Sequence, residues 1–215
     1  VGENAPQIDK LRVFYNHPGF VEPLVESLQA AFERIPPERR EAAAIAYTAH
    51  SIPQGMADNC RYATQLSEAC RLVTTTAKRS NPWQLVYQSR SGPPQQPWLE
   101  PDICDHIKTL HEQGVTDVVV LPIGFVSDHL EVLFDLDTEA KELAGELGMH
   151  MVRAATAGTH PRFIQMIREL IEERMTDNPE RLVLGQHPAS HDVCPTDCCL
   201  YTPARPPMGG RPAAT

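Results

Sequence analysis

The sequence predicts an α/β domain with a four-stranded parallel sheet and helices on both of its faces. Strand-like apolar runs alternate with segments of helical periodicity along the chain. The run DVVVLPIGF at 117–125 is almost continuously apolar, which is typical of a parallel strand covered on both sides. Parallel strands need crossover connections, and the helical segments between the apolar runs supply them.

Local signals define each element in turn. The first helix is predicted over 20–35, where Pro36 and Pro37 end it. A later helix ends at the C-cap glycine Gly114, and the last one begins at Pro161, a residue suited to the first helical position. The predicted strands are 41–51, 83–90, 117–125 and 150–157. The predicted helices are 20–35, 56–77, 99–114, an acidic helix starting near 128, and 161–175.

Composition narrows the possible classes of protein. The 215 residues are 41% hydrophobic and 22% charged, as in an ordinary soluble globular protein. The net charge of −9 argues against nucleic acid and anionic membranes as partners. We find no apolar run near the roughly 18 residues of a membrane span and no secretory segment in VGENAPQIDK. We therefore expect a cytoplasmic protein, and we also expect it to be a monomer.

The acidic helix raises a question of charge. Glu131, Asp135 and Glu139 are spaced i, i+4 and i+8, so an α-helix places all three on one face. Like charges at this spacing cost a few tenths of a kcal/mol per pair. Either solvent screens an ordinary exposed face, or a cation binds or passes along these carboxylates.

Polar residues gather where predicted strands end, including His50, Ser51 and the segment 127–131. In open α/β sheets ligands bind outside the carboxyl ends of the strands, so His50 and Glu131 are expected to face one cleft. Imidazole and carboxylate together suit acid–base chemistry or the handling of a metal ion. The sequence has no dinucleotide fingerprint, phosphate-binding loop or nucleophile elbow, so nucleotide binding and acyl transfer have no support.

Three of the six cysteines, Cys194, Cys198 and Cys199, crowd into HDVCPTDCCLYTP, which suggests metal ligation. The spacing differs from the regular C-x₂-C of zinc ribbons, and a reactive thiol tail is the alternative. Cys60 lies on a polar stretch where it is accessible as a fourth ligand. The two other cysteines, Cys70 and Cys104, are predicted to be core thiols. The other histidines are assigned to the surface or to helix caps: His106, His111, His160, His187 and His191.

Three long segments resemble the signature segments of the ferrochelatase family, which inserts ferrous iron into porphyrins. They are YTAHSIP at 47–53, WQLVYQSRSGPPQQPWLEPD at 83–102, and LPIGFVSDHLEVLFDLDTEA at 121–140. The resemblance runs from about residue 10 to 175. It implies a Rossmann-like, chelatase-type domain. This would be the C-terminal one of two domains and would work with the N-terminal domain of the same protein. TAHSIP together with the cysteine cluster most resembles the actinobacterial branch, which acts on coproporphyrin III.

The resemblance implies a role for each matched position. His50 and Glu131 would be catalytic and face the substrate Fe²⁺, and Asp135 and Glu139 would continue an acidic line for the ion. Asp135 stands where the family more often has Glu. The implied porphyrin-cleft residues are Ser51, Arg90, Trp98, Phe125, Asp128 and His129. The implied ligands of a [2Fe–2S] cluster are Cys60, Cys194, Cys198 and Cys199.

The predicted domains are a C-terminal chelatase domain at 1–180, a cysteine-rich cluster-binding segment at 181–200, and a disordered tail at 201–215. The predicted activity is insertion of Fe²⁺ into coproporphyrin III to give coproheme. The alternatives are a non-catalytic porphyrin- or haem-binding module and a chelatase for another tetrapyrrole.

Overall fold

A computed structural model describes residues 6, 8–92 and 95–200. Its sheet has the strand order β2-β1-β3-β4, and every pair of neighbours is parallel. The strands are β1 (Ala44–His50), β2 (Trp83–Gln88), β3 (Asp117–Leu121) and β4 (His150–Arg153). The predicted four-stranded parallel sheet is confirmed, although the strands are shorter than the apolar runs that predicted them.

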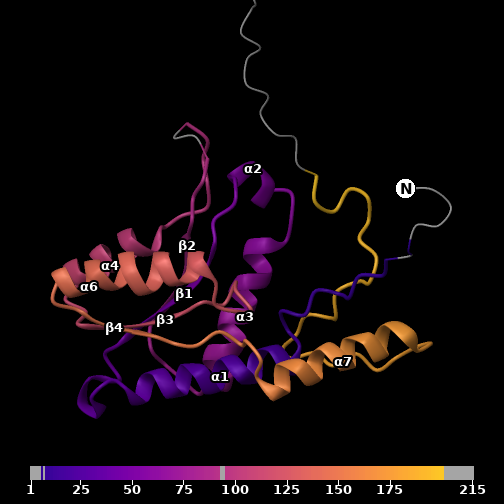
Figure 1. The fold of residues 1–215 in the computed structure, drawn as a ribbon, viewed down its shortest axis with the longest axis horizontal. Coiled ribbons are helices and arrows are strands. Elements are labelled where there is room, and N and C mark those ends of the chain that lie inside the picture. The colour runs from indigo at the N-terminus through magenta and orange to yellow at the C-terminus, as the bar shows by residue number, and fades with distance from the viewer. Residues whose placement is uncertain (1–5, 7, 93–94, 201–215) are drawn as a thin grey trace, which may run out of the picture.

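The helices cover both faces of this sheet, as predicted (Figure 1). Helices α1 and α7 lie side by side on one face, and α4 and α6 lie on the other. The long helices are α1 (Pro18–Glu33), α3 (Tyr62–Thr76), α4 (Ile103–Glu112) and α7 (Pro161–Met175). The short ones are a 3₁₀ turn (Pro37–Arg39), α2 (Gln54–Ala57), α5 (Leu130–Val132), a π-helix (Leu133–Ala140) and α6 (Lys141–Glu146).

Strand β3 shows how the two core layers are built. Val119 and Leu121 point into a cluster with α1, α3 and α7, whereas Val118 and Val120 point into a cluster with α4, the π-helix and α6. All four of these side chains are fully buried. Alternate residues of a strand face opposite sides, so a strand that is apolar on both sides must lie in the middle of a three-layer domain.

Two predicted helices differ from the structure. The helix predicted over 56–77 is divided into α2 and α3, with Cys60 in the turn between them. In that turn the Asn59 side-chain amide donates to the Gly55 carbonyl (2.8 Å), a local bond that competes with continuation of the helix. The acidic helix is not regular either, because its middle, Leu133–Ala140, is a π-helix with i→i+5 bonding.

The cysteine-rich segment 181–200 has no helix or strand, but it is attached to the domain. Asn16, which is fully buried, accepts the Leu184 N–H at its carbonyl (2.8 Å) and donates its side-chain amide to the His187 carbonyl (3.0 Å). Arg12 forms a buried pair with Glu173 (2.6 Å) and also donates to the Leu182 carbonyl (3.0 Å). These bonds hold the segment against residues 12–16 of the domain.

The tail at 201–215, which we predicted to be disordered, lies outside the described residues. Among the described residues, none of the helices combines the length and the apolar character needed to cross a membrane.

Candidate active site

The structure brings His50 and Glu131 together, as the sequence predicted. His50 ends β1, and Glu131 lies in the first turn of the helix that follows β3, the neighbouring strand. His50 Nε2 lies 3.8 Å from Glu131 Oε1, and the two side chains are 40% and 34% exposed. The pair is therefore preformed at the carboxyl edge of the sheet, and both side chains are partly exposed.

A glycine allows the β3 loop to approach the end of β1. Gly124 donates its N–H to the Thr48 carbonyl (3.0 Å), and a Cβ atom at this position would lie 2.6 Å from the Cβ of Ala49. Real Cβ contacts are longer than this, so a side chain would push the loop away from β1. Because Glu131 follows this loop closely, its distance from His50 depends on Gly124.

Two hydrogen bonds orient His50. Its Nδ1 bonds to the Ser51 carbonyl, and its own carbonyl accepts the Tyr62 hydroxyl (3.0 Å). Burial raises the pKa of Tyr62 to about 12, so the hydroxyl keeps its proton and remains a donor. A carbonyl only accepts, so Nδ1 carries the hydrogen, and in the neutral ring Nε2 presents its lone pair to Glu131. Two acceptor atoms 3.8 Å apart are too far for a direct hydrogen bond but can both bind a metal ion between them.

The two outer carboxylates of the acidic helix differ from each other. Asp135 accepts hydrogen bonds from the Gln88 amide (3.2 Å) and from the Ser89 hydroxyl, which tie the π-helix to the end of β2. Glu139 is exposed. Asp135 therefore has a structural role in addition to its charge, whereas the exposed Glu139 has none among the described contacts.

Two of the predicted porphyrin-cleft residues, Ser51 and Arg90, line a cavity of about 390 Å³ at the same edge of the sheet. Ser51 donates its hydroxyl to the Leu99 carbonyl (2.9 Å), and Arg90 donates to the Gln96 carbonyl (3.0 Å). Trp98 pairs with Pro53 in an isolated β-bridge. These contacts hold the loop after β2 against the segment that follows β1.

The other three predicted cleft residues stabilise the start of the acidic helix. Phe125 is buried in the second core cluster, and its ring meets the His129 ring edge-to-face with centroids 5.4 Å apart. Asp128 accepts two hydrogen bonds from Arg153 (3.0 and 3.1 Å). Arg153 also donates to Asp137 in the π-helix (2.6 Å).

Arg153 and Tyr62 are site residues that the sequence did not reveal, because side-chain partners distant in sequence leave no local pattern.

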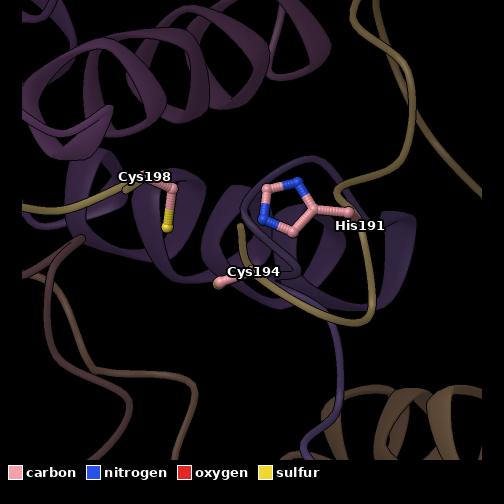
Figure 2. A group of neighbouring side chains, drawn as sticks. All are labelled: His191, Cys194 and Cys198. Atoms are coloured by element: carbon pink, nitrogen blue, oxygen red, sulfur yellow. The ribbon is translucent and has the colours of Figure 1, made fainter. Parts of the chain in front are cut away.

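The four cysteines predicted as ligands line one cavity of about 250 Å³, which Arg61, Tyr62 and His191 also line. Cys70 is fully buried among apolar side chains and Cys104 packs against the second core cluster, as predicted for core thiols. His191 is exposed, as its surface assignment predicted, and it also lines this cavity. A ring nitrogen of His191 and the sulfur atoms of Cys194 and Cys198 all lie within 4.8 Å of one another (Figure 2).

Two further histidines test the same assignment. His160 caps α7 by accepting the Arg162 N–H (3.2 Å), as predicted. His106 is buried on α4, so the surface or cap assignment was wrong for it.

Comparison with known proteins identifies the family of the chain. A family model described as Ferrochelatase matches residues 2–175. The chain belongs to the ferrochelatase family. The matched region includes His50, Glu131 and Cys60 and ends before the C-terminal cysteines.

Several curated ferrochelatases are similar to this chain. A ferrochelatase from Rhodopirellula baltica is 53% identical over 99% of the chain and 60% of its own length. A coproporphyrin III ferrochelatase from Streptomyces coelicolor is 47% identical with the same coverage, and one from Nocardia farcinica is 44% identical over 98% of the chain and 63% of its own length. The chain thus spans less than two thirds of these relatives.

Proposed function

We propose that the protein represented by this chain inserts ferrous iron into coproporphyrin III. The observation that carries the proposal is the His50–Glu131 pair, with Nε2 and Oε1 3.8 Å apart at the carboxyl edge of the sheet. Family membership supports metal insertion into a porphyrin. The coproporphyrin III substrate is supported by the names of relatives such as those from Streptomyces and Nocardia.

The residues of the pair suit the chemistry of the reaction. Insertion of a divalent ion requires the loss of two pyrrole protons and the partial removal of water from the ion. The free lone pair of His50 Nε2 can accept a pyrrole proton, because Nδ1 is already committed to the Ser51 carbonyl. Glu131 can hold the incoming cation or stabilise the imidazolium that forms, and the exposed Glu139 can attract the ion.

The cleft of the whole protein would need a second wall. We propose that it comes from an N-terminal domain of the same protein, since the relatives are longer than this chain. The loop after β2, which Ser51 and Arg90 contact, would then face the propionates at the edge of the porphyrin. Arg90 has the charge for that contact.

The test is anaerobic insertion of Fe²⁺ into coproporphyrin III by the full-length protein, followed by the absorption of the product. We expect His50→Ala and Glu131→Gln to lower kcat at least a hundredfold while porphyrin binding, followed by fluorescence quenching, is retained. Near-normal kcat in either variant would refute the assignment. Binding of porphyrin without any insertion by the wild type would instead indicate a porphyrin-binding module.

We also propose that the cysteine-rich segment holds a [2Fe–2S] cluster. The donor set fits, because Cys60, Cys194, Cys198 and Cys199 all line one cavity. Thiolates are the ligands of such clusters. When bound, the cluster would supply one-electron redox chemistry and would cross-link the segment to the domain.

Protein purified without oxygen should then be reddish-brown and contain about two iron and two sulfide per chain, as the cluster type requires. Cys60→Ser should bleach the colour, whereas Cys70→Ser should keep it. Colourless protein that contains zinc would reject the cluster.

A further inference from the structure

Three buried oxygen atoms near the catalytic pair have no hydrogen-bond partner among the residues that the structure describes. They are the Thr48 hydroxyl, the Gln88 amide oxygen and Glu131 Oε1. Thr48 is fully buried and Gln88 is 1% exposed, so bulk solvent does not supply partners for these two side chains. Buried polar atoms in native proteins are almost always paired with protein or with an ordered water, so this group calls for a bound partner.

The register of the sheet places Thr48 and Gln88 on the same face as His50. His50 pairs directly with Gln88 across β1 and β2, and Thr48 lies two residues before His50. Alternate residues of a strand share a face, and Ala46 and Val86 belong to the second core cluster, so all three side chains point to that side. The π-helix packs on this side as well. Thr48 and Gln88 are diagonal neighbours there, a separation that one water molecule can bridge.

Gln88 is held so that its amide oxygen is left for a ligand. Its Nε2 donates to Asp135 (3.2 Å), four residues beyond Glu131. A carboxylate only accepts, so this bond fixes which end of the amide faces the π-helix. The backbone carbonyl of Gln88 accepts the Ser51 N–H (2.8 Å), and the Ser51 carbonyl in turn bonds to His50 Nδ1. Gln88 therefore contacts the segments that carry both members of the pair.

The available donor and acceptors match one water molecule. The Thr48 hydroxyl can donate to the water, and the water can donate its two hydrogen atoms to Gln88 Oε1 and Glu131 Oε1. These three bonds equal the number that a buried water typically makes. A divalent cation fits less well, because the three oxygen atoms carry one charge between them and Mg²⁺ or Ca²⁺ takes six or more ligands.

We propose that Thr48 and Gln88 hold a buried water that donates to Glu131 Oε1 and so positions this carboxylate toward His50. Thr48 and Gln88 act through Glu131 and are positioning residues. A hydrogen bond from water does not remove the charge of Glu131, which stays able to receive a cation or to stabilise an imidazolium. The effect on rate rests on the proposed metal insertion, whereas the water itself is a property of the fold.

A high-resolution crystal structure of the full-length protein tests the water directly, whether or not the protein inserts iron. We expect one water within hydrogen-bond distance, about 2.7–3.2 Å, of all three oxygen atoms. Thr48→Val removes the hydroxyl and should lose this water, whereas Thr48→Ser keeps the hydroxyl and should keep the water. A wild-type structure with no water at this position, or with a metal ion there, would overturn the proposal.

The insertion assay on the same variants tests the positioning role. Thr48→Val should lower kcat about tenfold with porphyrin KM unchanged, because small displacements of a reacting group are costly, and Thr48→Ser should restore most of the rate. Gln88→Met should lower kcat at least as much. The double variant Thr48→Val/Gln88→Met should be no slower than Gln88→Met, since both residues act through one water. Gln84→Met is the matched control, an exposed residue on the same face of β2, and should change nothing.

Two kinetic results would overturn the positioning role: a normal kcat in Thr48→Val, or losses in the double variant that multiply those of the single variants. A wild type that contains the water but inserts no iron would refute the proposed function and leave the water site supported.

Discussion

Arg153 should control the position of Glu131 although it lies on another strand. Its guanidinium donates to Asp128, just before the helix, and to Asp137, within the π-helix, so it braces the segment on both sides of Glu131. Its side chain is 17% exposed, and those of Asp128 and Asp137 are 38% and 33% exposed. Arg153→Met removes both contacts and leaves two carboxylates that water can reach.

The loss of unfolding free energy in Arg153→Met can be worked out from these contacts and exposures. The bond to Asp137, at 2.6 Å and with a half-buried acceptor, should contribute about 1.5 kcal/mol, the low end for a charged hydrogen bond. The pair with Asp128 is screened by water and should contribute about 0.5 kcal/mol. The sum of about 2 kcal/mol, divided by a urea m-value of about 2–3 kcal/mol/M, lowers the unfolding midpoint by about 0.7–1 M.

Equilibrium unfolding in urea measures the stability, and the insertion assay on the full-length protein measures the position of Glu131. We expect kcat to fall at least tenfold, because displacements of about 1 Å at a reacting group can cost two orders of magnitude. Arg153→Lys keeps the charge but reaches one carboxylate at a time, so it should be intermediate. Arg168→Met, which removes an exposed pair with Glu172 on α7, is the matched control and should change neither quantity. A midpoint within 0.2 M of wild type for Arg153→Met would refute the bracing role.

Three further predictions follow from single contacts. Glu139→Ala should raise the Fe²⁺ concentration that gives half-maximal rate, without loss of stability. Asp135→Ala should also lower the urea midpoint of unfolding, because Asp135 anchors the π-helix to β2. Equal stability of the two variants would contradict this difference. Tyr62→Phe removes the donor to the His50 carbonyl and should lower kcat with porphyrin KM unchanged; a change confined to KM would count against it. Burial lowers the pKa of His106 below its ordinary value of about 6.5, so on acidification the unfolded chain takes up a proton before the folded one does. The free energy of unfolding should therefore decrease below about pH 6.5, and His106→Gln should make this decrease smaller, as urea midpoints at pH 7.5 and 5.5 would show; an unchanged slope would reject this source.

The sequence predicted those features that depend on local pattern. The alternation of apolar runs with helical periodicity predicted four parallel strands, and Pro161 marked the start of α7 to the residue. Strand-end polarity predicted that His50 and Glu131 would meet, because neighbouring parallel strands end at the same edge. These inferences need only the period of burial and the direction of the chain.

The parts that the sequence did not predict depend on contacts between distant residues. The π-helix cannot be read from periodicity, because Leu136 and Ala140 remain buried at a four-residue interval, as they would in an α-helix. Arg153 meets Asp137 only after β4 is placed beside β3. The sequence also could not show that the C-terminal cysteines line a cavity with Cys60, which lies in a turn more than a hundred residues earlier. Such sites require the tertiary structure.

The three carboxylates of the acidic helix, Glu131, Asp135 and Glu139, differ in what surrounds them. Asp135 accepts hydrogen bonds from Gln88 and Ser89, which replace those of water and lower the cost of placing its charge there without a cation. Glu139 is exposed, where water screens it. Glu131 differs, since its Oε1 is inaccessible to solvent, accepts no hydrogen bond from the described residues, and faces the lone pair of His50. The need for a proton or a cation is therefore concentrated at the inner end of the row, where the proposed reaction requires it.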